Sequence, residues 1–149
     1  MEQAKFSPVH IEEYFNVSPD VVFDAWINVD TIKQWLFKGD NSHIAEVKID
    51  LQKGGAFSIT EKTDEGELID HFGTYTEVNR PQKLSFTLET PKHFKEVTNV
   101  EITITPDGIG SDLIFQQTGV DPILVEDSWR RMFRALASAI NNADNISAS

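Results

Sequence analysis

The chain begins with a regular alternation of apolar and polar residues. Between residues 9 and 17 an apolar side chain falls at every second position, except that Glu13 interrupts the apolar stripe. This period is typical of a half-buried strand. Ser18, Pro19 and Asp20 then supply an N-cap, a proline at the first helical position and an acid in the first turn, so we expect a helix to start there. A second short helix is expected over residues 30–37.

From residue 44 to residue 118 the helical spacing gives way to short β-rich runs. They are separated by turn segments rich in glycine, proline, asparagine and aspartate, which preset or permit turn dihedrals. Such a succession is the pattern of an antiparallel meander, because short loops join strands that are neighbours in space. We predict six further strands, over residues 44–51, 56–62, 68–78, 83–89, 97–105 and 111–118.

The segment after Gly119 predicts a long amphipathic helix. Its apolar residues share a stripe about 100° wide, namely Val125, Trp129, Met132, Phe133, Leu136 and Ile140. Only this helix is long and amphipathic enough to cover the apolar face of the sheet. We therefore expect one α+β domain over residues 1–149 with a helix-grip fold: a curved antiparallel sheet of about seven strands, two short helices after the first strand, and the long C-terminal helix packed across the sheet.

The net charge of the chain makes some classes of binding partner improbable. It has 13 Lys and Arg against 24 Asp and Glu, a net charge of −11, which repels phosphate backbones and anionic membranes. We expect no nucleic-acid partner and no membrane insertion, since no apolar run reaches the length needed to span a bilayer. The absence of cysteine excludes disulfides and thiolate metal sites. Residues 1–8 do not resemble a signal peptide, which favours a cytoplasmic location.

The position of Gly73 indicates which face of the strand over residues 68–78 points inward. A glycine in mid-strand usually marks a close approach of other backbone, so we expect its face to meet the long helix, with His71 and Tyr75 on the same side. A bulge in this strand would instead turn the alternate stripe inward. Because the apolar faces of helix and sheet converge, we predict a ligand cavity between them. The residues expected to bind the ligand are Glu13, Trp35, Phe57, His71, Tyr75, Phe86, Trp129 and Phe133. Four other aromatic residues are expected to be plain core: Phe15, Phe23, Trp26 and Phe115.

Several motifs together resemble a known family. They are residues 18–26 with 32–36, then 53–57, 73–86 and 128–132. In order and spacing they resemble the activator of heat-shock protein 90 ATPase homologue family, which belongs to the START and birch-pollen-allergen (SRPBCC) superfamily. The resemblance implies the helix-grip fold and a hydrophobic cavity, but no single activity, since relatives include lipid and polyketide binders, cyclases, dehydratases and co-chaperone domains. Relatives often carry a basic residue where this chain has Glu13, so a ligand acid recognised there in relatives would be repelled here.

Three functions remain open at this point. The leading hypothesis is binding of a small apolar molecule, lipid-like or aromatic, beneath the long helix. The second is an enzyme of the cyclase or dehydratase type that uses Glu13, His71 and Tyr75 for proton transfer. The third is an interaction domain for a chaperone or another acidic partner, docked by three arginines expected on the outer face of the helix, Arg130, Arg131 and Arg134.

The sequence contains no pattern typical of a cofactor-binding or metal-binding site. The four histidines lack the spacing of a metal site. The Gly54-Gly55 pair precedes a strand and so cannot present a helix N-terminus to a phosphate. We predict no cofactor and no metal. The sequence leaves the ligand and the oligomeric state open, and a homodimer is compatible with it.

Overall fold

The computed structural model describes residues 6–148, and the side chains of residues 6–140. The predicted order of elements is confirmed, and every strand begins and ends within two residues of its expected position. The elements are β1 (Val9–Phe15), α1 (Pro19–Asp24), α2 (Val29–Trp35), β2 (Ser42–Ile49), β3 (Ala56–Thr63), β4 (Leu68–Asn79), β5 (Lys83–Leu88), β6 (Thr98–Asp107), β7 (Gly110–Thr118) and α3 (Pro122–Ala148).

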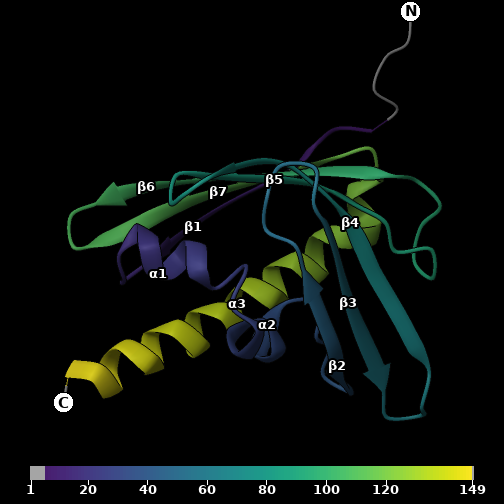
Figure 1. Ribbon diagram of the computed structural model, residues 1–149, viewed down its shortest axis with the longest axis horizontal. Helices are drawn as coiled ribbons and strands as arrows, with labels where there is room; N and C mark the ends of the chain where they lie inside the picture. Colours follow the sequence, from purple (N-terminus) through teal and green to yellow (C-terminus); the bar gives the residue numbers. More distant parts are fainter. Residues whose placement is uncertain (1–5, 149) are drawn as a thin grey trace, which may run out of the picture.

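The strands form one antiparallel sheet in the order β1-β7-β6-β5-β4-β3-β2. The first strand thus pairs with the last, and β2 forms the opposite edge. Figure 1 shows the sheet bent around α3, with β5, β6, β7 and β1 on one side of the helix and β2, β3 and β4 descending beside it. Helix α2 packs against α3. This is the helix-grip α+β fold that the pattern of elements predicts.

The bend of the sheet is centred on β4. Its burial alternates, with His71, Gly73 and Tyr75 facing the interior, as expected. The expected close approach of other backbone at Gly73 is confirmed, and that backbone belongs to β5. A Cβ placed on Gly73 would lie 1.8 Å from the carbonyl oxygen of Thr87. The bulge in this strand falls after Tyr75, so the inward stripe is as expected up to Tyr75, and beyond the bulge Val78 packs against the core.

The core is dominated by aromatic rings. The residues predicted to be plain core are buried, namely Phe15, Phe23, Trp26 and Phe115. Trp35 is also fully buried, and its indole Nε1 donates a hydrogen bond to the carbonyl of Ala25 at 3.0 Å. The ring of Trp35 stacks on Phe133 of α3 with centroids 6.0 Å apart. Across the described residues, we find no helix with the length and apolar character needed to cross a membrane.

Candidate ligand-binding site

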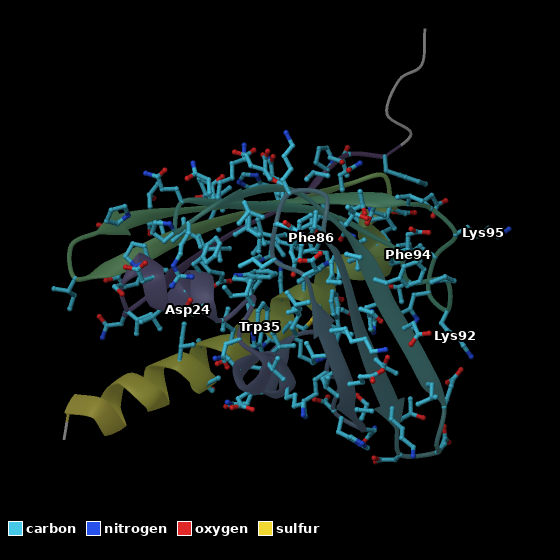
Figure 2. The ribbon with its side chains drawn as sticks, in the orientation of Figure 1. Asp24, Trp35, Phe86, Lys92, Phe94 and Lys95 are labelled. Atoms are coloured by element: carbon cyan, nitrogen blue, oxygen red, sulfur yellow. The ribbon has the colours of Figure 1, made fainter. Side chains whose placement is uncertain are left out.

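A hollow of about 250 Å³ lies under the first half of α3. Its other walls come from β3, the first half of β4, the end of β5 and the segment that joins β5 to β6. Figure 2 labels Phe94 on that segment, with Lys92 and Lys95 projecting outward beside it. We call this hollow the outer cavity. It is lined by Phe37, Glu61, His71, Leu88, Thr90, His93, Phe94, Gln117, Leu124, Val125, Ser128, Trp129, Arg131 and Met132.

A second and much smaller hollow of about 10 Å³ lies deeper in the molecule. We call it the inner cavity. Its volume is close to the least that can hold one water molecule. Its walls are almost entirely apolar, and they are formed by Trp26, Leu36, Phe37, Phe57, Ile59, Tyr75, Leu84 and Phe86.

The residues predicted to bind a ligand are divided between these places. His71 and Trp129 line the outer cavity, whereas Phe57, Tyr75 and Phe86 line the inner one. The remaining two aromatic residues, Trp35 and Phe133, are buried in the core and line neither cavity. The structure therefore does not bring the predicted aromatic set together around a single space.

Glu13 lies apart from both cavities. It is half-buried in β1, where it faces Leu113 of β7 in the strand register. Because β1 is an edge strand, a side chain on its inner face can still reach water at the rim of the sheet. Glu13, His71 and Tyr75 consequently do not form the acid–base group that the sequence suggested.

A chain of polar side chains occupies one wall of the outer cavity. The Nε2 atom of His71 lies 3.0 Å from Oε1 of Glu61, and its Nδ1 atom lies 3.0 Å from the hydroxyl of Thr90. The other carboxylate oxygen of Glu61 accepts a hydrogen bond from the Ser42 hydroxyl at 2.6 Å. Glu61, His71 and Thr90 are all buried. They come from β3, from β4 and from the segment after β5, so the bent sheet is what assembles them.

The pKa values of Glu61 and His71 define the protonation of this hydrogen-bonded network. Burial alone would raise the pKa of the Glu61 carboxyl, but the hydrogen bonds from His71 and Ser42 outweigh it and hold the pKa below its ordinary value. Burial also lowers the pKa of His71, and the bond to Glu61 offsets only part of that shift. At neutral pH the pair is an ionised carboxylate and a neutral imidazole. Nε2 then carries the proton that Glu61 accepts, and Nδ1 accepts the proton of the Thr90 hydroxyl.

Phe37 separates the two cavities, since it lines both of them. Its ring lies flat on the imidazole of His71, with centroids 4.3 Å apart and planes 3° from parallel. Its backbone has φ 62°, a left-handed conformation that is rare for a residue with a Cβ. Its backbone N–H points to the sulfur of Met132 at 3.0 Å. Sequence reasoning missed Phe37, because the helix expected over residues 30–37 ends at Trp35 and Phe37 leaves it with a left-handed backbone that no helical period predicts.

A second polar chain fixes α3 to the sheet at the floor of the outer cavity. The indole Nε1 of Trp129 donates to Oε1 of Gln117 at 2.9 Å, and the amide nitrogen of Gln117 donates to the Thr98 hydroxyl at 3.0 Å. Thr98 in turn donates to the carbonyl of Leu88 at 2.8 Å. Three strands are thus tied to the helix through buried groups, which holds the orientation of the Trp129 ring against the cavity.

The arginines of α3 do not share one outer face. Arg130 is exposed and forms an ion pair with Glu126 at 3.1 Å, and Arg134 is exposed as well. Arg131, by contrast, is half-buried and lines the outer cavity. The prediction that all three form an external cluster was therefore wrong for Arg131, because the apolar stripe is narrow enough for the next position to reach under the helix.

Metal binding has no candidate in this part of the chain. Within residues 6–148 we find no group of three or more His, Asp or Glu side chains placed to hold a metal ion. The pair of His71 and Glu61 is committed to hydrogen bonds with each other and with Thr90 and Ser42.

Both the sequence and the fold of this chain are similar to those of known proteins. Residues 16–141 match the protein family described as Activator of Hsp90 ATPase homolog 1-like protein. The chain belongs to this family. The match covers both short helices, β2 to β7 and most of α3, and it confirms the resemblance seen in the sequence motifs. No curated protein matches the chain.

Solved structures of other proteins share the fold of this one. An AHSA1-like protein from Aeromonas hydrophila is 20% identical, with 93% of this chain and 94% of that chain covered and a TM-score of 0.81. A protein from Chromobacterium violaceum is 18% identical over 89% of this chain and 96% of that chain, with a TM-score of 0.81. A protein of unknown function from Staphylococcus aureus is 17% identical, with 96% and 98% covered and a TM-score of 0.78. At such identities the likeness shows the fold alone.

Proposed function

We propose that this protein binds a small, mainly apolar molecule, aromatic or lipid-like, in the outer cavity. The observation that carries the proposal is the hollow of about 250 Å³, which opens to solvent at the side of the exposed residues Leu124 and His93. Proteins bind small molecules in concave, largely preformed hollows of this kind. A hollow of this size beneath the one long helix is what a ligand would fill.

The walls suit a ligand with an apolar body and a polar end. Half of the lining is apolar, including Phe94, Trp129 and Met132, and the rest is polar, including His71 and Gln117. Ligand sites commonly combine apolar walls with a few placed polar groups. The volume lies just below the range of about 300–1,000 Å³ that drug-sized ligands occupy. It therefore favours a molecule with one or two rings or a short acyl chain.

The site proposed here differs from the one expected from sequence. His71 and Trp129 remain in it, and Phe37, Phe94 and Met132 join them. Phe57, Tyr75 and Phe86 line the inner cavity on the other side of Phe37, and Trp35 and Phe133 belong to the packed core. Partnership with a chaperone, formation of a homodimer and a cytoplasmic location stay predictions from the sequence.

Native mass spectrometry of the purified protein, with a panel of single-ring and two-ring aromatic compounds and short fatty acids, tests the proposal. Val125→Trp should fill the outer cavity and abolish binding, because Val125 is buried in its wall. Val21→Trp provides the matched control, since Val21 is exposed on α1, away from the cavity. Binding that persists unchanged in Val125→Trp would place the ligand elsewhere.

A second candidate function is proton-transfer catalysis, and the chain of Glu61, His71 and Thr90 favours it. An ionised carboxylate that orients a neutral imidazole, which in turn accepts a hydroxyl proton, is the arrangement of a general base. In this second candidate function, Glu61 and Thr90 act with His71 in the proton transfer that the sequence analysis assigned to Glu13 and Tyr75. Glu61 and Thr90 both line the cavity together with His71.

Exchange of the α-protons of phenylacetone in D₂O, followed by NMR, tests for such a base. We expect the protein to accelerate the exchange and expect Glu61→Gln and His71→Gln to remove the acceleration. Glu13→Gln should leave it intact, because Glu13 lines neither cavity. If the wild-type protein gives only the rate of the buffer, the network is a structural one.

A further inference from the structure

Arg131 combines partial burial with the lack of an anionic partner among the described residues. Arg80 pairs with Asp24 at 2.6 Å, and Arg130 pairs with Glu126 at 3.1 Å. Arg134 is exposed to solvent. Within the part of the chain that the structure describes, the guanidinium of Arg131 takes part in no ion pair and no hydrogen bond, although the residue is half-buried in the cavity wall.

The acid in the same cavity does not serve as that partner. Both oxygens of Glu61 already accept hydrogen bonds, one from His71 and the other from Ser42. Gly39 lies between the two charges: a Cβ built on it would lie 3.5 Å from Oε2 of Glu61 and 4.0 Å from Nη2 of Arg131. Gly39 and the hydroxyl of Ser42 thus lie beside the carboxylate of Glu61, and no hydrogen bond or ion pair joins Glu61 to Arg131.

A half-buried arginine in a cavity wall without an anionic partner is an unusual feature in a chain with a net charge of −11. Arginine stays charged at any physiological pH, and removing its charge from water is unfavourable unless an anion or several acceptors compensate. The planar fork of five N–H donors matches a carboxylate with two parallel hydrogen bonds. Ser128, which precedes Arg131 by three residues on α3 and also lines the cavity, places a hydroxyl on the same side of the helix.

We propose that Arg131 anchors an anionic group of the ligand, so that the outer cavity selects small apolar carboxylates over neutral or cationic molecules of the same shape. The apolar body would lie against Phe94, Trp129 and Met132, which line the same space. This inference rests on the proposed function and names the ligand class for that site. It also moves the acid-recognition site away from Glu13, where a carboxylate would be repelled.

Isothermal titration calorimetry with three ligands of one shape tests the inference: 3-phenylpropionate, 3-phenylpropanamide and 3-phenylpropylamine. We expect the wild-type protein to bind the carboxylate about tenfold or more tightly than the amide, since hydrogen bonds to a charged group are the stronger ones. We expect the amine to bind most weakly. Quenching of the tryptophan fluorescence, to which Trp129 in the cavity wall contributes, gives a second readout on titration.

Variants of α3 then assign the preference to one side chain. Arg131→Gln should remove the preference for the carboxylate and leave the affinity for the amide unchanged, which shows that the cavity is still folded. Arg131→Lys should retain part of the preference, because it keeps the charge but not the fork. Arg130→Gln is the matched control and should behave as the wild-type protein, since Arg130 is exposed and paired with Glu126.

The outcomes separate this inference from the proposed function. If none of the three compounds binds the wild-type protein, the proposed function itself fails for ligands of this size. If the amide binds as tightly as the carboxylate, ligand binding is supported and the role of Arg131 is overturned. A preference for the carboxylate that survives in Arg131→Gln would also overturn it.

Discussion

The outer and inner cavities lie on either side of Phe37 but are built on different principles. The inner one is reduced to about 10 Å³ because its rings fill the space among themselves, with Phe57 5.2 Å from Phe86 and 5.4 Å from Tyr75 between centroids. The outer one stays open at about 250 Å³ and has a polar wall. Rings can rotate and slide until they pack, whereas buried polar groups are held in place by the directions of their hydrogen bonds. The hollow therefore persists beside the polar network.

Truncation of one aromatic ring in each cavity should give the largest difference in stability. Phe86→Ala removes a buried ring from the packed inner region and should lower the free energy of unfolding by about 3–5 kcal/mol. Phe94→Ala should cost at least about 1 kcal/mol less, because Phe94 already borders open space and has fewer contacts to lose. Figure 2 shows the two rings at the centre and at the edge of the molecule. Urea unfolding measures both, and equal losses would contradict the contrast in packing.

His71 of the outer cavity and Tyr75 of the inner one lie on the same face of β4, with Gly73 between them. Gly73→Ala should destabilise the protein by about 3 kcal/mol, since its Cβ would force the backbone of Thr87 to move. Gly66→Ala is the control: nothing lies within 4 Å of its Cβ, but φ is +91°, so we expect a cost of about 1 kcal/mol. Thermal unfolding compares the two variants. A smaller loss in Gly73→Ala than in Gly66→Ala would show that the sheet can bend without a glycine there.

Phe37 is the partition, and two substitutions test its ring and its backbone separately. Phe37→Ala and Phe37→Gly both remove the ring, and both should allow ligands with two fused rings to bind across the joined cavities. Phe37→Gly should be the more stable variant by about 1 kcal/mol, because glycine adopts φ 62° without strain. Urea unfolding and calorimetry with 2-naphthoate measure these effects. Equal stability of the two variants would mean that the backbone relaxes once the ring is gone.

The smallest effect expected is a loss of stability in weak acid that originates in the outer cavity. Burial lowers the pKa of His71 in the folded protein, so the unfolded chain binds a proton first as the pH falls below about 6.5. The stability that His71 contributes is complete above that pH and is lost as the pH falls through the pKa of the folded state. The lowered pKa of Glu61 adds a further loss below about 4.5.

Urea unfolding between pH 8 and pH 5 measures this loss. His71→Gln should flatten the dependence on pH in that range. His43→Gln, at an exposed position in β2, should leave it as in the wild-type protein. A wild-type profile that is flat from pH 8 to pH 5 would show that His71 is protonated with equal ease in the folded and unfolded chain.

Much of the fold was predictable because it follows from local pattern. The alternation in strand β4 placed His71 and Tyr75 on one face, and the apolar stripe of α3 identified Trp129 and Phe133 as inward. The site was predicted only in part. Glu61 and Thr90 carried no signal, since each is a single polar residue in a strand or loop whose partner lies far along the chain.

The sequence by itself determined the order of the elements, the face that each presents and the closure of the sheet by α3, because periods of 2 and 3.6 residues act within one element. Only the tertiary structure decided where the hollow lies and which polar groups surround it. That depended on how closely β5 approaches β4 at Gly73, on the direction that Phe37 takes after α2, and on the meeting of Glu61, His71, Thr90 and Arg131 from separate elements. Contacts between such distant segments are set by packing of the whole chain, which no local period records.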